Sequence, residues 1–271
     1  ITLDAIAVQN NDWQWNTAFN FARIRNEVIE IHPDIERIGM GGGESVGIRF
    51  EAGGSMGDLY ASAFLRENSD PDNDINEGRI VVTDDGMPRK TQDAQYMGNV
   101  EPDWTLGWNN NITWKDFTFS FLIDSKMGGV VVSQTEAMLD GYGVSKRTGD
   151  ARDVGYLEVD AVTEGGTAVT QVDPETWFLA TGDRNGIMEY YVYDRTNIRL
   201  SQVSLAYRLN LATPAIDNMT FSVYGRNLFF FYKKAPFDPG LVMSTNRNNQ
   251  GLDNFNLPTV RSIGLNLNIN F

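Results

Sequence analysis

The stretch that decides the fold is the end of the chain, Pro258-Thr-Val-Arg-Ser-Ile-Gly-Leu-Asn-Leu-Asn-Ile-Asn-Phe271. Apolar residues occupy every second position of this stretch, and glycine or asparagine occupies the positions between them. The apolar set is Ile263, Leu265, Leu267, Ile269 and Phe271, and the other set is Gly264, Asn266, Asn268 and Asn270. Because successive side chains of a strand point to opposite faces, this pattern predicts a strand with one apolar and one polar face.

The same alternation recurs along the chain and predicts about seven strands. Trp13 to Phe21 places its aromatic residues on one face, and Trp104 to Trp114 does the same with Asn110 as an exception. Lys115-Asp116 then separates that strand from Phe117 to Ser125, which is the length of a two-residue hairpin. Residues 198–209 and 221–232 form a further pair whose alternation slips, and β-bulges explain such slips. Gly225 is the expected site of one bulge.

The connections between these strands are alternately short and long. The short ones are 10–12, 115–116 and 211–218, and the long ones are 26–103, 127–195 and 233–257. This alternation is typical of outer-membrane barrels, whose short turns and long loops lie at opposite ends. We therefore predict that all three long connections leave the same end of the sheet. Loops of this length need structure of their own, and Arg79 to Thr83 followed by Asp85-Gly86 predicts a small hairpin.

Several motifs in this order resemble the SusC/RagA family, the TonB-dependent transporters of the Bacteroidetes outer membrane. Its C-terminal signature resembles Tyr224-Gly-Arg-Asn-Leu-Phe229, then Phe237-Asp-Pro239, then Asn256-Leu-Pro-Thr-Val-Arg261 leading to Phe271. Arg199 to Tyr207 is similar to the penultimate hairpin strand. Gly98-Asn-Val-Glu-Pro102, followed by Trp104 to Phe121, is similar to a further block of the family.

The resemblance implies an all-β fold, an antiparallel transmembrane β-barrel of which residues 1–271 form the C-terminal portion. The complete barrel is expected to have 22 strands around a plug, and the plug and N-terminal strands are expected outside this chain. The implied activity is TonB-dependent import of an oligosaccharide or peptide across the bacterial outer membrane, without enzymatic chemistry and without a cofactor. The implied partners are the remainder of the transporter, a SusD-like surface lipoprotein, TonB and outer-membrane lipid. The alternative is a soluble all-β carbohydrate-binding or adhesion module.

Composition narrows the function classes. The formal net charge of -14 argues against nucleic acid as a partner, because phosphate binding needs a basic face. The chain has no cysteine and one histidine, His32, which argues against a thiol or histidine-based active site and against a zinc site. The acidic stretch from Asp70 fails the EF-hand pattern at its sixth and twelfth positions, although a looser calcium site stays open. No apolar run is long enough for a transmembrane helix.

Candidate functional residues follow from the two faces of the strands. The residues expected to face lipid are Trp104, Trp108, Phe119, Phe121, Leu265 and Ile269. Those expected to face the lumen, where they hold a plug or contact substrate, are Asn109, Asn111, Asp124, Tyr224 and Arg226, the last two by the family pattern. Phe271 is expected to be an assembly signal, an interfacial anchor, or both. The loop aromatics Trp177, Phe178, Tyr190, Tyr191 and Tyr193 either form a partner surface or pack on one another.

Overall fold

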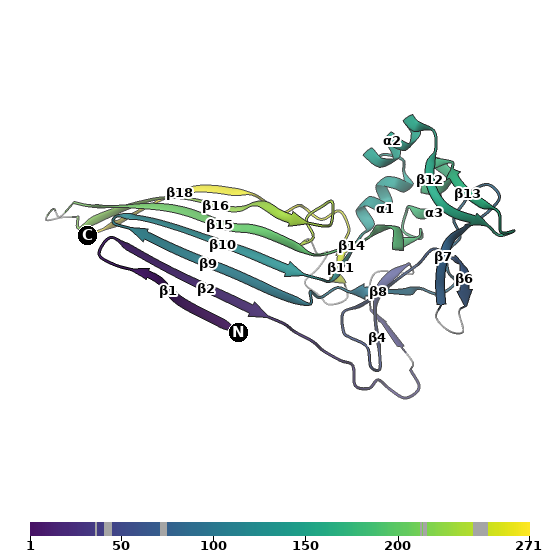
Figure 1. Cartoon of the computed structure of the whole chain (residues 1–271), viewed down its shortest axis with the longest axis horizontal. Helices are drawn as coiled ribbons and strands as arrows, with labels where there is room; N and C mark the ends of the chain where they lie inside the picture. Colours follow the sequence, from purple (N-terminus) through teal and green to yellow (C-terminus); the bar gives the residue numbers. More distant parts are fainter. Residues whose placement is uncertain (36, 41–44, 71–74, 212, 214–215, 241–248) are drawn as a thin grey trace.

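The structure is a computed structural model of the chain, and it describes all residues except 36, 41–44, 71–74, 212, 214–215 and 241–248. Its largest element is a seven-stranded sheet in the order β1-β2-β9-β10-β15-β16-β18, with every neighbouring pair antiparallel (Figure 1). The strands are β1 (Thr2–Gln9), β2 (Trp13–Ala22), β9 (Trp104–Trp114), β10 (Phe117–Met127), β15 (Asn197–Asn210), β16 (Asn218–Lys233) and β18 (Ser262–Asn270). The predicted all-β fold and strand count are confirmed.

The register of the sheet places the apolar positions of each strand opposite the apolar positions of its neighbours. Phe119 lies opposite Ile112 on one side and Leu205 on the other, and Leu205 lies opposite Val223, which in turn pairs with Leu265. Directly opposed residues share a face of an antiparallel pair. The sheet therefore has an apolar face, which contains this row, and a polar face, which contains the alternate positions.

The slip in alternation comes from a bulge, but Gly225 is not its site. Gly225 pairs regularly with Val203 and Ile263, and the register between β15 and β16 shifts between Leu200 and Gln202. Opposite that shift, β16 accommodates Asn227, whose φ of 52° lies in the left-handed region. Asparagine tolerates this conformation better than most other residues with a Cβ, so the bulge can form at Asn227.

The three long connections leave the same end of the large sheet, as predicted, and they fold together into one unit that we call the loop domain (Figure 1). The first connection contributes β3 (Arg37–Met40), β4 (Val46–Glu51), β5 (Asp58–Ala61), β6 (Arg66–Asp70), β7 (Ile75–Val82) and β8 (Gln95–Asn99). The second contributes β11 (Val130–Ser133), α1 (Gln134–Gly141), α2 (Lys146–Val154), β12 (Leu157–Thr163), β13 (Ala168–Val172), α3 (Pro174–Thr181), the 3-10 helix η2 (Met188–Tyr191) and β14 (Val192–Asp194). The third contributes β17 (Leu252–Asp253).

Strands from different connections pair with each other in the loop domain. The first and second connections meet in the sheet β13-β12-β7-β6, where β7 and β12 are parallel, and the second and third meet in β14-β11-β17. A further sheet, β3-β4-β5-β8, comes from the first connection alone. The turn expected at Asp85-Gly86 is present, since the Gly86 amide donates to the Thr83 carbonyl at 2.9 Å. The preceding strand, however, is an inner strand of the four-stranded sheet and not part of an isolated hairpin.

Apolar burial is confined to the loop domain. Among the described residues, every buried hydrophobic side chain lies outside the seven strands of the large sheet. One cluster gathers Ile48, Leu59, Val132, Tyr191 and Leu252 from all three connections. The large sheet instead buries polar residues such as Asn110 and exposes residues such as Phe221 and Leu265. No helix in the described part of the chain has the length and apolarity needed to cross a membrane.

Candidate functional site

The polar face of the large sheet brings the predicted lumen-facing residues onto one surface, but not into one cluster. Asn109 and Asn111 are next-but-one neighbours on β9, and the Asn111 Nδ2 donates to Ser120 Oγ of β10 at 3.0 Å. Thr113 continues the row, with its Oγ1 donating to Asn111 Oδ1 at 3.5 Å. The first contact joins β9 to β10 and the second runs along β9, so this part of the polar face presents a network of amides and hydroxyls.

Asp124 lies on the same face, closer to the loop domain, in a charged group of its own. Its Oδ2 accepts a hydrogen bond from Ser201 and lies 3.7 Å from an Arg199 guanidinium nitrogen. Arg199 also donates to Ser201 Oγ at 3.2 Å, and its guanidinium lies 6.0 Å from the Phe230 ring centroid. The Asp124 carboxylate therefore already has a hydroxyl donor and a cationic neighbour on this face.

Tyr224 and Arg226 form a third group on this face. Tyr224 pairs with Gly264 in the register, and a Cβ added at Gly264 would lie 2.5 Å from the Tyr224 ring. The tyrosine therefore lies flat across β18, which only a glycine at position 264 permits. The Arg226 guanidinium lies 5.5 Å from the centroid of the same ring, a cation–π distance.

The apolar face carries all six residues expected to contact lipid, and its aromatic rings contact one another between strands. Trp108 stacks on Phe19 with centroids 5.6 Å apart and meets Phe121 edge-on at 5.6 Å. Phe119 also contacts Phe121, at 5.6 Å. Such pairs add about 0.5–1.5 kcal/mol each beyond their buried area.

Two of the polar residues on the apolar face accept hydrogen bonds from tryptophans. Asn110 is fully buried, and its Oδ1 accepts from Trp15 Nε1 at 2.9 Å. Thr17, which pairs with Asn110 in the register, accepts from Trp108 Nε1 at 2.9 Å. Each indole N–H therefore has an acceptor on the apolar face itself. This explains why the exception noticed in the sequence falls at Asn110.

The base of the loop domain is the place where the three long connections leave the large sheet. Arg195, two residues before the start of β15, holds them together there. Its Nε donates to the Pro239 carbonyl at 2.9 Å and one terminal nitrogen donates to the Val100 carbonyl at 2.8 Å. Burial lowers the pKa of Arg195. Val100 and Pro239 belong to the two motif segments, 98–102 and 237–239, that carry the sequence resemblance. One arginine therefore joins all three long connections where they leave the sheet.

A polar cavity of about 580 Å³ opens beside this base, between the end of β2 and the start of β9. Asn26 organises its wall: its Nδ2 donates to Glu101 Oε2 at 3.0 Å, and its Oδ1 accepts from Ser55 Oγ at 2.9 Å. Tyr96 and Asp103 also line it. Burial, followed by the nearby Asp58 carboxylate, raises the pKa of Tyr96.

The centre of the helical part of the loop domain is a buried ionic and aromatic group around Arg147. Its guanidinium binds Asp140 Oδ2 and lies 4.9 Å from the Tyr190 and 5.4 Å from the Tyr191 ring centroid. Tyr191 also donates to Asp140 Oδ2, at 3.1 Å. Burial by itself lowers the pKa of Arg147, but the Asp140 carboxylate outweighs it and raises that pKa. This group holds α1 and α2 on the aromatic core.

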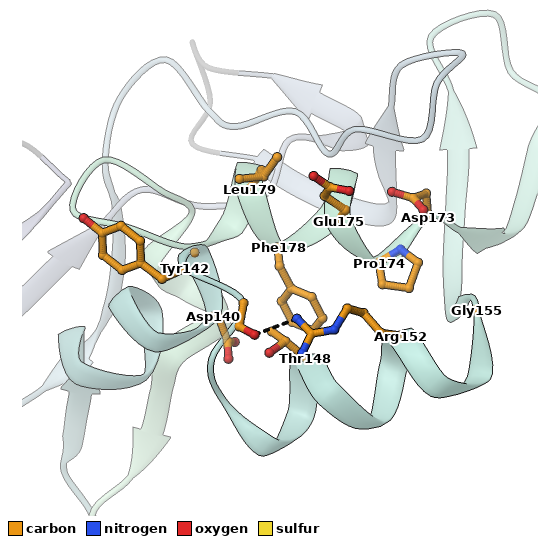
Figure 2. A pocket seen from close by; sticks show the side chains of 12 residues that line it. Asp140, Tyr142, Thr148, Arg152, Gly155, Asp173, Pro174, Glu175, Phe178 and Leu179 are labelled. Carbon is orange, nitrogen blue, oxygen red and sulfur yellow. Dashed lines mark hydrogen bonds between the residues drawn. The ribbon is translucent and has the colours of Figure 1, made fainter.

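An open cavity of about 570 Å³, which we call the outer pocket, lies between the end of α1, the inner side of α2 and the start of α3. Phe178 and Thr148 are buried residues of its lining, and Tyr142 and Leu179 are exposed ones. Figure 2 shows Leu179 and Glu175 along one side of the pocket, with Arg152 on the opposite side. The Arg152 guanidinium donates to the Gly143 carbonyl at 2.6 Å (Figure 2).

The five loop aromatics named from the sequence mostly pack on one another. Trp177 and Phe178 are each 3% exposed and Tyr191 is fully buried. Trp177 contacts Tyr190 edge-on at 6.0 Å, and Tyr190 contacts Tyr191 at 5.3 Å. Tyr193 donates to Glu136 and meets Phe237 edge-on. Of the two interpretations, packing is the one that the structure supports for Trp177, Phe178 and Tyr191.

The remaining sequence candidates do not gather at a site. His32 lies in an exposed turn, where its Nδ1 accepts from the Asp34 amide at 3.3 Å. The calcium candidate includes residues 71–74, which lie outside the described part of the chain. Arg195, Arg147 and the lining of the outer pocket were not identified from the sequence. They lie in irregular segments and short helices without periodicity or motif, so the sequence carried no signal for them.

No protein-family profile matches the chain. It is 27% identical to "TonB-dependent receptor P3" of Formosa agariphila, over 97% of this chain and 27% of that protein. It is 21% identical to "TonB-dependent receptor P39" of the same organism, over 100% of this chain and 30% of that protein. The chain therefore spans less than a third of the length of these curated relatives.

Solved structures show the same fold. The chain matches the RagAB peptide transporter with a TM-score of 0.65 at 16% identity, over 98% of this chain and 28% of that one. It matches the RagAB peptide importer in the "open-open" state equally well, with a TM-score of 0.65 at 16% identity, over 100% of this chain and 28% of that one. The comparisons confirm the resemblance to SusC/RagA-like TonB-dependent transporters. The chain aligns with less than a third of each of these proteins, and its seven-stranded sheet is open, as expected for part of such a fold.

Proposed function

We propose that this chain is part of a transporter that imports a bulky nutrient, an oligosaccharide or peptide, across the bacterial outer membrane with energy delivered through TonB. The relatives support TonB-dependent import as the general activity. The structural observation that carries the proposal is that the large sheet exposes apolar side chains and buries polar ones. Its aromatic face has no protein core to cover it among the described residues, which is the arrangement that a lipid environment requires.

In this proposal the apolar face contacts lipid through Trp104, Trp108, Phe119, Phe121, Leu265 and Ile269. The polar face lines the lumen, where Asn109, Asn111, Asp124, Tyr224 and Arg226 hold a plug or contact the passing substrate. The hydrogen-bonded networks around Asn111 and Asp124 favour the holding role for those two. The loop domain stands outside the membrane, where a SusD-like surface lipoprotein covers it.

The open edges of β1 and β18 need the remainder of the transporter, because lipid does not tolerate unpaired backbone groups. We propose that Phe271, which is 87% exposed beyond the end of β18, helps the assembly machinery to recognise this strand. The test is to delete Phe271, or change it to Asp, in the full-length transporter and to follow the appearance of heat-modifiable barrel. Unchanged assembly kinetics would show that the terminal aromatic residue is not recognised.

The function itself is tested by uptake in living cells. A strain that lacks the transporter should fail to grow on one class of oligosaccharide or peptide, and the full-length gene should restore growth only while TonB is present. Growth that is independent of TonB would contradict the proposal. Extraction separates the alternative, a soluble carbohydrate-binding or adhesion module: that module would be released from cells without detergent, whereas the transporter would stay in the outer membrane.

A further inference from the structure

The outer pocket has a buried aromatic residue in its lining and exposed apolar residues beside it. Phe178 in its lining is 3% exposed, whereas Tyr142 and Leu179 in the same lining are 70% and 63% exposed. Elsewhere on this corner of the loop domain, Val144 before α2 and Val154 at its end are 67% and 61% exposed, although neither lines the pocket. Single exposed apolar residues need no explanation, but several around one cavity mark an interaction site.

The pocket is formed before any partner arrives. Ser145 and Asp173 cap the starts of α2 and α3 by accepting from the amides of Thr148 and Thr176, respectively, at 3.0 and 2.8 Å. Arg152 ties α2 to the end of α1 through Gly143. A cavity of about 570 Å³ with these fixed walls is large enough for a bulky side chain of a partner. A preformed pocket that takes one apolar anchor is the usual centre of a protein interface.

Charge around the pocket indicates what kind of polypeptide fits. The pocket lining contains three carboxylates, Asp140, Asp173 and Glu175, and one guanidinium, Arg152. Asp140 is already paired with Arg147, so Asp173 and Glu175 supply the acidic charge at the pocket. Permanent interfaces are more apolar than this, whereas exchangeable ones mix apolar anchors with charged surroundings. A basic segment would be attracted here and would meet few like charges.

We propose that the outer pocket is the docking site for a separate extracellular polypeptide, which inserts an apolar side chain flanked by Lys or Arg. The inference rests on the proposed function, since it places the loop domain outside the membrane and adds a specific surface for its partner. The remainder of the transporter must join this chain at the edges of β1 and β18. Figure 1 places α2 at an outer corner of the loop domain, away from the large sheet. A second protein is therefore the occupant that this position and this charge favour.

Site-specific photocrosslinking in living cells tests the proposal. A photoreactive phenylalanine analogue replaces Tyr142 in the full-length transporter, and the same analogue replaces Glu158, an exposed residue of β12 that does not line the pocket. We expect a product with a second polypeptide from position 142 and at least ten-fold less from position 158. Mass spectrometry should map the partner's crosslinked peptide to an apolar residue with Lys or Arg beside it, and the yield should fall as salt is raised.

A substitution then tests whether the pocket itself is responsible. Leu179→Asp should reduce the crosslink from position 142 at least ten-fold. Leu257→Asp, the same change at a residue that is 88% exposed in the third connection, should leave it unchanged. Both side chains are exposed, so neither substitution should unfold the loop domain.

The proposal is overturned by a product within the transporter's own chain, by a product with a second copy or with a lipid, or by yields equal at positions 142 and 158. A partner peptide without basic residues also overturns it. Uptake is measured in the same cells. If TonB-dependent uptake persists while the crosslink is absent, the docking inference alone fails. If the unaltered transporter supports no uptake, the proposed function fails whatever the crosslink shows.

Discussion

The large sheet and the loop domain differ in where they place apolar side chains: the loop domain buries them, and the sheet exposes them on one face. In the loop domain, large apolar side chains such as Tyr191 and Leu59 are fully buried. In the sheet, Asn110 is fully buried while Leu265 is 85% exposed. Hydrophobic burial stabilises the first region in water, whereas the second region needs an apolar solvent on its aromatic face. The difference indicates two environments for one chain, and substitutions in the two regions should therefore behave differently.

The largest effect should come from emptying the loop-domain core. Trp177 is 3% exposed and stacks on Phe64 with centroids 5.5 Å apart. We expect Trp177→Ala to destabilise the loop domain by about 3–5 kcal/mol and to leave the heat-modifiable barrel intact. Limited proteolysis of the loop domain, compared with gel mobility of the unheated barrel, measures both. The control is Tyr142→Ala at an exposed position, which should stay within about 0.5 kcal/mol.

A charge on the apolar face should have the next largest effect. Phe121→Arg should cost about 2–4 kcal/mol of barrel stability in lipid near the membrane midplane. The neighbouring residue Ser120 lies on the polar face, so Ser120→Arg should cost much less. Denaturant unfolding in lipid vesicles gives both values. Equal costs would mean that the two faces meet the same solvent, and the comparison between the regions would fail.

Asn110 offers a smaller and more local test. Removing its carboxamide leaves Trp15 N–H without the acceptor it has at 2.9 Å, and an unpaired buried donor costs about 1–3 kcal/mol. We expect Asn110→Val to be destabilising by that amount in lipid and nearly neutral when Trp15 is already changed to Phe. Asn109→Val, on the opposite face, is the matched control. An unchanged cost in the Trp15→Phe background would show that the hydrogen bond is not the reason.

The smallest expected effect is the pH dependence of α3. Hydrogen bonds from the backbone amide and then the side chain of Thr176 lower the pKa of Asp173. A lowered pKa in the folded state means that the stabilisation is present above the unfolded pKa, about 3.9, and is lost as the pH falls through the folded pKa. Asp173→Ala should cost roughly 1 kcal/mol at pH 7. Below about pH 4 the difference from the unaltered protein, measured by hydrogen exchange in α3, should shrink.

The sequence predicted the large sheet well and the loop domain poorly, for a physical reason. Strands such as Trp13–Ala22 and Ser262–Asn270 follow a period of two, so their residues reveal their face without knowledge of their neighbours. The loop domain depends on pairings between distant segments, such as β7 with β12 and Arg195 with Val100 and Pro239. Neither the strand pairing nor the arginine contacts produce a periodic pattern in the sequence. The helices α1, α2 and α3 are each eight or nine residues long, too short to show a clear amphipathic repeat, and the outer pocket they form was missed with them.

Spin labelling measures directly which solvent meets each face of β18. Single cysteines are placed in turn at positions 263–270 of a full-length transporter from which any other cysteines have been removed, in lipid vesicles; this chain itself contains none. Collision rates of each label with oxygen, which concentrates in lipid, and with a water-soluble nickel complex are then compared. We predict a period of two, with oxygen favoured at Leu265, Leu267 and Ile269 and relatively less favoured at Asn266 and Asn268. A flat profile, or one with the opposite phase, would contradict the assignment of the aromatic face to lipid.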